Sequence, residues 1–151
     1  MDKQYHPTEI EEKWAKVWSE RKVKNESSTE SFSQVIPPPN VTGTLHMGHS
    51  FQYAIMDFYT RYNHMAGKDS YWQVGSDHAG IATQMVVENN LAKKDITRKD
   101  LGREKFLEEV WSWKGYSEEK ITSQIKRLGN TVDWNKYRFT LDDDFNEVID
   151  D

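Results

Sequence analysis

The order of the predicted strands and helices constrains the fold of this chain more than any other feature. Residues 32–36 alternate in polarity as a strand does, and residues 70–74 form a second strand-like run. Each run is followed by a glycine-bearing turn and then by a helical pattern, over about 47–65 and 81–92. This order predicts parallel strands joined by right-handed crossovers. We therefore expect an α/β fold, a Rossmann-like parallel sheet with flanking helices.

Other local signals add helices on either side of this alternating region. Thr8 and Glu11 have the spacing of a capping box, and apolar residues at helical spacing then predict a helix over about 8–21. The polar stretch 24–31 is typical of a linker. Further helices are expected over about 99–113 and 117–128, with Gly129 ending the second, whereas the acidic end 142–151 shows no closing element. We divide the chain into an N-terminal helix and linker, 1–31, and the first half of a Rossmann-type domain, 32–151.

The predicted helix over 47–65 has an apolar stripe, and the spacing of its members is that of one helix face. The stripe consists of Phe51, Ile55, Phe58, Tyr62 and Met65. Such an amphipathic pattern predicts a helix that buries this face in the core. Gly67 stands where it can end the helix.

Composition excludes several classes of protein. The chain has no cysteine, so a disulfide framework and a thiolate metal site are both ruled out. No apolar run is long enough to cross a membrane and no signal-peptide pattern opens the chain, so we expect no membrane partner and a cytoplasmic location. The formal charge is −5, with acidic and basic residues mixed throughout. A nucleic-acid partner would therefore need groups outside this chain or a local basic patch.

The first strand–helix turn carries two histidines. His46 and His49 are three residues apart at the predicted helix start, so both imidazoles can face the same way. A helix N-terminus suits phosphate, and each imidazole can donate to an oxygen that gains negative charge. Gly48 lets a flat base lie against the backbone, and Gly43 permits a tight approach in the preceding loop. A plainer interpretation is that the two histidines only cap the helix. Their spacing disfavours zinc, so no protein-bound metal is expected.

A second polar cluster follows the next strand. Ser76, Asp77 and His78 lie in the turn 75–80. If the two strands are neighbours, both turns face one crevice, because ligands bind at the carboxyl ends of parallel strands. Asp77 can bind an ammonium group, and His78 can add a polar contact. Alternatively, Ser76 or Asp77 is an ordinary N-cap of the next helix.

Several motifs resemble those of one enzyme family. The segment 37–49, Pro-Pro-Pro-Asn-Val-Thr-Gly-Thr-Leu-His-Met-Gly-His, resembles the HIGH region of class I aminoacyl-tRNA synthetases. Its loop and the segment 77–84, Asp-His-Ala-Gly-Ile-Ala-Thr-Gln, are similar to the valyl-tRNA synthetases rather than to their isoleucine, leucine and methionine relatives. The stretches 102–106, 111–114 and 127–134 match as well, so the resemblance extends from the first helix to Phe139.

This resemblance implies an activity, its substrates and a set of site residues. Members of the family use ATP, with Mg²⁺, to activate an amino acid as an aminoacyl-adenylate and then transfer the acyl group to tRNA. The amino acid would be L-valine and the tRNA tRNA(Val), with His46 and His49 acting as catalytic residues on the ATP phosphates. The implied binding residues are, for ATP, Gly43, Thr44, His46, Gly48 and His49, and, for valine, Pro38, Pro39, Asn40 and Asp77.

The resemblance also implies parts that this sequence does not contain. They are the second half of the nucleotide-binding fold with its Lys-Met-Ser-Lys-Ser type loop, the editing insertion and the anticodon-binding region. We therefore expect weak activity from this chain alone and most tRNA contacts elsewhere. Two alternatives stay open. One is a small nucleotidyltransferase with the same histidine turn, and the other is a non-catalytic truncated paralogue that binds nucleotide or a partner through Trp14, Trp18, Trp111 and Trp113.

Overall fold

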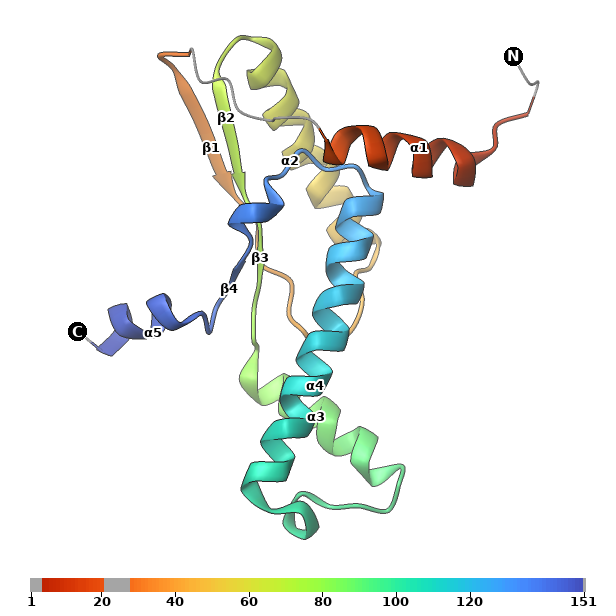
Figure 1. The fold of residues 1–151 in the computed structure, drawn as a ribbon, viewed down its shortest axis with the longest axis vertical. Coiled ribbons are helices and arrows are strands. Elements are labelled where there is room, and N and C mark those ends of the chain that lie inside the picture. The colour runs from red at the N-terminus through yellow and green to blue at the C-terminus, as the bar shows by residue number, and fades with distance from the viewer. Residues whose placement is uncertain (1–3, 21–27, 151) are drawn as a thin grey trace. The chain divides into compact units, whose positions relative to one another are not determined.

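A computed structural model of the chain describes residues 4–20 and 28–150 (Figure 1). Its elements are α1 (Pro7–Ser19), β1 (Ser31–Val35), α2 (Met47–Met65), β2 (Asp69–Gln73), β3 (Gly75–Ser76), α3 (Gly80–Ala92), α4 (Arg98–Arg127), a 3-10 turn (Trp134–Lys136), β4 (Arg138–Phe139) and α5 (Asp143–Asp150). Among these described residues, every helix is too short or too polar to span a membrane.

The first of two compact units contains the first pair of parallel strands. It comprises Met1–Ile36, His46–Val74 and Ser123–Tyr137. Strands β1 and β2 pair in parallel, in a register that sets Ser31 opposite Asp69. Helix α2 connects these two strands and packs against them. Its Tyr53 is fully buried and meets the ring of Trp72 on β2 edge-on, with 6.3 Å between ring centroids.

The second unit comprises Pro37–Leu45, Gly75–Thr122 and Arg138–Asp151, and it has its own strands and core. Strands β3 and β4 pair in parallel, and an isolated parallel bridge joins Asn40 to Asp77. The core lies between α3 and the part of α4 that belongs to this unit. Its buried members are Val87, Leu91 and Phe106, with Ile96, Leu101, Val110 and Trp113 packed around them.

The sequence-based expectation of an α/β fold with parallel strands and flanking helices is confirmed. Helix α2 begins and ends at the predicted residues, and Gly67, with a φ of 87°, follows its end as expected. Gly129, with a φ of 71°, likewise follows α4. The strands begin one residue earlier than predicted, at Ser31 and Asp69. The domain boundary near residue 31 stays a prediction.

Other predictions about the helices are wrong. The capping box at Thr8 does not form, because helix α1 already begins at Pro7 and has His6 as its N-cap. Proline suits the first helical turn, since its missing N–H would have no helical partner there. Predicted residue 21 and residues 24–27 of the predicted linker lie outside the described residues. The acidic end forms α5, whose first turn places Asp143 and Asp144 where a helix favours negative charge.

The two helices expected over 99–113 and 117–128 are one element, α4. The break lies instead at Gly102, whose φ of 75° and ψ of 173° are not helical. Residue Gly115, where the prediction placed the break, is helical. A single glycine costs a helix about 1 kcal/mol, and the ion pair of Lys114 with Glu118, 2.7 Å apart and one turn apart in sequence, spans this point.

The expectation that α2 buries its apolar stripe is also wrong. All five stripe residues are exposed, Ile55 by 42% and Met65 by 86%. The buried face holds Tyr53, Asp57, Thr60 and Asn63 instead. This face has the same helical period as the stripe, so the period alone cannot tell which of the two faces is covered.

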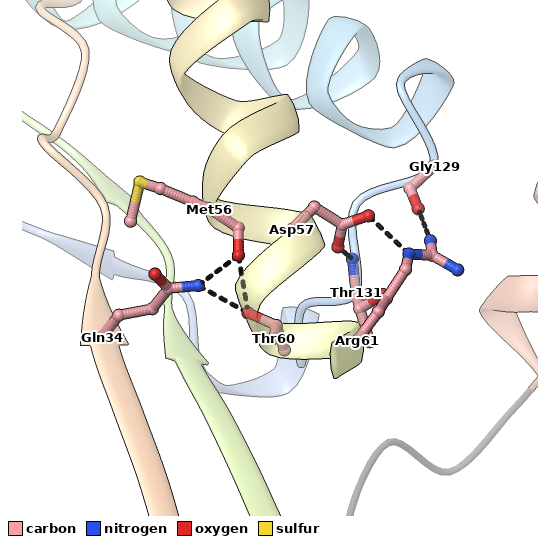
Figure 2. Close-up of polar contacts among 7 residues, drawn as sticks. All are labelled: Gln34, Met56, Asp57, Thr60, Arg61, Gly129 and Thr131. Atoms are coloured by element: carbon pink, nitrogen blue, oxygen red, sulfur yellow. Dashed lines mark hydrogen bonds and ion pairs between the residues drawn. The ribbon is translucent and has the colours of Figure 1, made fainter. Parts of the chain in front are cut away.

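Hydrogen bonds make this polar face of α2 a packing surface (Figure 2). The Asp57 carboxylate accepts from the backbone N–H of Thr131 at 2.6 Å and from Nε of Arg61 at 2.6 Å. Arg61 also donates to the carbonyl oxygen of Gly129 at 2.6 Å, and the Gln34 side chain on β1 donates to the carbonyl oxygen of Met56 at 2.6 Å. These directed bonds, together with the ring of Tyr53, fix the rotation of α2 about its own axis and therefore the direction in which its first turn points.

Candidate functional site

The first turn of α2 is built by the two histidines themselves. His46 is the N-cap, with an extended backbone, and its Nδ1 accepts from the backbone N–H of Gly48 at 3.1 Å. The Nδ1 of His49 accepts from the backbone N–H of His46 at 3.2 Å, which completes a capping box. The ring centroids are 3.9 Å apart. The plainer interpretation of these residues, that they cap the helix, is therefore correct as a description of their hydrogen bonds.

Capping also decides where each imidazole carries its proton. A neutral imidazole has one N–H, so a ring whose Nδ1 accepts a hydrogen bond holds its proton on Nε2. Burial, and next the positive charge that His46 can take, lower the pKa of His49 and so favour its neutral form. The capped turn thus offers Nε2–H donors from His46 and His49, beside the N–H groups of a helix N-terminus.

Glycine at position 48 is needed by this arrangement. A Cβ atom built on Gly48 would lie 2.9 Å from Cε1 and 3.0 Å from Nδ1 of the His46 ring. Any larger residue would therefore displace the His46 side chain from its capping position. At Gly43, by contrast, a Cβ atom would meet nothing within 4 Å, so the chain's own packing does not require glycine there.

The second unit brings the predicted valine-side residues around Asp77 together. The backbone N–H of Asp77 donates to the carbonyl oxygen of Pro39 at 2.9 Å, and its carbonyl oxygen accepts from Val41 at 3.0 Å. The bridge partner Asn40 and the preceding Pro38 are exposed, whereas Pro39 is buried. The loop before α2 and the turn after β2 are thus paired through their backbones, as neighbouring strand ends would be.

Neither Ser76 nor Asp77 is the N-cap of α3, so that alternative is wrong. The N-cap is Ala79, whose φ of 41° lies in the left-handed region that non-glycine residues rarely adopt. Ser76 is buried and its Oγ donates to Oε1 of Glu118 at 3.4 Å. The Asp77 carboxylate accepts from the backbone N–H of Ala79 at 3.1 Å, which helps to hold the left-handed residue in place.

Sequence reasoning missed two α4 residues that hold the loop before α2. Trp113 Nε1 donates to the carbonyl oxygen of Val41 at 3.0 Å, and Ser117 Oγ donates to that of Gly43 at 2.9 Å. The signal available in the sequence was their spacing of four residues, which puts both on one helix face. The break predicted between them concealed it.

Three of the four tryptophans that the non-catalytic alternative names are exposed. Trp14, Trp18 and Trp111 are partly exposed, at 40%, 37% and 53%. Trp113 packs against the core of the second unit, and the Arg61 guanidinium lies 5.4 Å from the centre of the Trp18 ring.

Within the described residues, no group of three or more histidine, aspartate or glutamate side chains is placed to hold a metal ion.

The family to which these motifs belong is settled by sequence comparison. Residues 9–151 match the profile of the family described as tRNA synthetases class I (I, L, M and V). The chain belongs to this family. It is 56% identical, over 146 residues, to the valine–tRNA ligase of Acinetobacter baylyi. That match covers 96% of this chain and 15% of the ligase, so the chain spans about one seventh of this relative's length.

A solved structure of the class I synthetase type shows the same fold. The crystal structure of the ternary complex of Agrobacterium radiobacter K84 agnB2 LeuRS with tRNA and LeuAMS is similar to this chain with a TM-score of 0.73. The similarity covers 94% of this chain and 17% of the other, at 19% sequence identity. At this identity the likeness shows the fold alone.

Proposed function

We propose that this chain supplies the ATP- and valine-binding wall of a class I synthetase that activates L-valine and ligates it to tRNA(Val). The observation that carries the proposal is the capped first turn of α2. There, His46 and His49 use Nδ1 for the helix and keep a proton on Nε2 for a ligand. The 56% identity to a valine–tRNA ligase supports valine as the amino acid.

Each predicted site residue takes a role in this proposal. His46 and His49 donate to phosphate oxygens of ATP, which enters with Mg²⁺, while Asp77 pairs with the ammonium group of valine. The remaining residues line the two substrates, Gly43, Thr44 and Gly48 on the ATP side and Pro38, Pro39 and Asn40 on the valine side. His78 is not assigned to either substrate by the family resemblance.

The proposed reaction begins with attack of a valine carboxylate oxygen on the α-phosphorus of ATP. A new P–O bond forms, the bond to the leaving pyrophosphate breaks, and valyl-adenylate results. Negative charge develops on the phosphate oxygens in the transition state, where imidazole donors fixed in advance lower the barrier without reorganising. The tRNA 3′ end then takes the acyl group and AMP leaves. The formal charge of −5 supports placing most tRNA contacts in other regions of such an enzyme, for which we propose a cytoplasmic location.

A chimaera tests this proposal. This chain would replace the matching part of the Acinetobacter baylyi ligase, and valine-dependent exchange of pyrophosphate into ATP would be measured. We expect the chimaera to be active and the 151-residue chain alone to be weak or inactive. An inactive but folded chimaera would argue against the proposal. Full turnover by the chain alone would contradict the expectation that the second half of the nucleotide-binding fold is needed for activity.

Variants of the chimaera test the histidine role. His49→Ala should lower the rate of adenylate formation by roughly 10²–10³, the usual effect of removing one such donor, with a smaller change in ATP affinity. His64→Ala is the matched control, because His64 is an exposed histidine in the last turn of the same helix. Equal losses of rate and of ATP affinity would show that His49 binds the ground state only.

A further inference from the structure

One hydroxyl group outside the implied site residues makes three hydrogen bonds around Asp77. Thr140 follows β4, and its Oγ1 lies 2.9 Å from the backbone nitrogen of His78 and 2.6 Å from Nδ1 of the His78 ring. It also lies 3.1 Å from Oδ1 of Asp77. All three residues belong to the second unit. The sequence separates Thr140 from Asp77 by more than sixty residues, and no motif pointed to it.

If all three contacts are hydrogen bonds, counting protons decides which way they run. A hydroxyl has one proton and two lone pairs, and a carboxylate can only accept. The Thr140 hydroxyl therefore donates its proton to Oδ1 of Asp77, and the backbone N–H of His78 donates to one lone pair of Oγ1. The second lone pair can only accept, so Nδ1 of His78 must carry a proton and donate it. Oδ1 of Asp77, 3.4 Å from the same Nδ1, favours a proton there too.

We propose that Thr140 is a positioning residue for amino-group recognition. Its hydroxyl holds the Asp77 carboxylate and fixes the neutral His78 ring as the Nδ1–H tautomer. This inference rests on the proposed role of Asp77 as the partner of the valine ammonium group. The Thr140 hydroxyl thus sets the Nδ1–H tautomer of His78, whereas capping sets the Nε2–H tautomer of His46 and His49.

The carboxylate geometry supports this role. Among the residues that the structure describes, the hydrogen bonds to the Asp77 carboxylate both end on Oδ1, from Ala79 and from Thr140. Oδ2 therefore keeps its lone pairs for a ligand, and the side chain is 36% exposed. The turn itself is held tightly, since Thr83 Oγ1 donates to the carbonyl oxygen of His78 at 2.7 Å beside the left-handed Ala79. A carboxylate whose first oxygen is held in this way meets an ammonium group with little ordering cost.

A purely structural role for Thr140 makes a different prediction. The backbone N–H of Thr140 already donates to the carbonyl oxygen of Ser76 at 3.2 Å, which ties β4 to β3 without the hydroxyl. If the hydroxyl only fills a polar gap, its proton can point to Nδ1 of His78, and the ring then carries its own proton on Nε2. The tautomer of His78 separates the two roles.

The first experiment reads the tautomers in the chain as it exists. Long-range ¹H–¹⁵N correlation spectra of the ¹⁵N-labelled 151-residue chain would be recorded at about pH 8, where histidine is ordinarily neutral. His78→Gln identifies the His78 signals among the five histidines. We expect the Nδ1–H pattern for His78, its loss in Thr140→Val and its retention in Thr140→Ser. An Nε2–H pattern in the wild type, or a folded Thr140→Val chain with an unchanged pattern, would overturn the proposal.

The second experiment separates this inference from the proposed function. Calorimetry on the chimaera would compare the binding of a non-hydrolysable valyl-adenylate analogue with that of the same molecule lacking the amino group. Thr140→Val should lower the affinity for the amine-bearing analogue by about tenfold, the scale of one hydrogen bond to a charged group. The affinity for the analogue without the amino group should be unchanged. Equal weakening of both analogues would contradict the amino-group role. A chimaera that binds neither analogue would contradict the proposed function, while the tautomers would still decide whether the hydroxyl directs His78. If Thr140→Val fails to fold, the wild-type tautomer and Thr140→Ser decide alone.

Discussion

The helices of the two units bury different kinds of side chain. In the first unit, α2 turns Asp57 and Thr60 inward and leaves its apolar stripe exposed. In the second unit, α3 and α4 enclose Val87, Leu91 and Phe106 in an ordinary apolar core. The two helices that flank the candidate turns therefore depend on different forces.

This difference separates orientation from stability. Apolar burial is non-directional and contributes in proportion to the area removed from water. Hydrogen bonds such as those of Asp57 to Thr131 and Arg61 contribute less each, but they hold only in one geometry. We infer that polar contacts fix the rotation of α2, and with it the donors of His46 and His49, whereas the packing free energy comes from apolar burial in both units.

The largest expected effect is in the apolar core. Phe106 is only 1% exposed, so Phe106→Ala should lower the free energy of unfolding by about 3–5 kcal/mol. Urea denaturation followed by circular dichroism measures this loss. Leu107→Ala is the control, because the neighbouring Leu107 is 37% exposed and should cost much less. Similar losses in both variants would show that the cluster is not the core of the second unit.

The next effect appears at high pH in the first unit. Burial raises the pKa of Tyr53 to about 12, against about 10 for an unfolded tyrosine. The folded state therefore keeps a proton that the unfolded state loses, so this stabilisation is complete below pH 10 and disappears as the pH rises to about 12. The free energy of unfolding should fall by about 3 kcal/mol over this range. Comparing the pH dependence of unfolding in the wild type and Tyr53→Phe isolates it, and parallel curves would refute the burial of this hydroxyl.

A smaller effect is expected from the polar face of α2. Asp57→Asn keeps an acceptor for the Thr131 N–H but removes the charge that pairs with Arg61, which should cost about 1–2 kcal/mol. Glu12→Gln on the exposed side of α1 is the control and should be nearly neutral. In the chimaera, Asp57→Asn should also slow adenylate formation if α2 orients the histidines. Loss of stability with an unchanged rate would break the link between this face and the site.

Local signals in the sequence predicted the order of elements but not which surfaces they bury. Glycines at the ends of helices and the strand-like runs depend on neighbouring residues only, so the bounds of α2 were predicted correctly. The buried face of α2 depends on partners far along the chain, including Gln34 and Thr131, whose contacts no local pattern contains. The break predicted between 113 and 117 has the same explanation, because Trp113 and Ser117, on either side of Gly115, bond to the distant residues Val41 and Gly43.

The candidate site shows the same division. The motif around His46 and His49 was recognisable because its residues are contiguous, and the structure adds that capping fixes their tautomers. Thr140 and Trp113 could not be found in this way, because each reaches its partner across more than sixty residues. The contiguous candidate residues could thus be named from the sequence, whereas the residues that hold them in place required the fold.

The smallest expected effect tests the exposed stripe of α2 directly. Phe51 is 68% exposed, so Phe51→Ser should change the free energy of unfolding of this chain by no more than about 0.5 kcal/mol. Tyr53→Ala, two residues away on the buried face, should cost roughly 3–5 kcal/mol. A loss above about 2 kcal/mol for Phe51→Ser in the chain alone would mean that the stripe is covered and that the comparison of the two faces is wrong. If instead the loss appears only in the chimaera, then the part of the ligase beyond the matched 15% covers the stripe, and the apolar period of α2 specifies a contact that this chain does not make by itself.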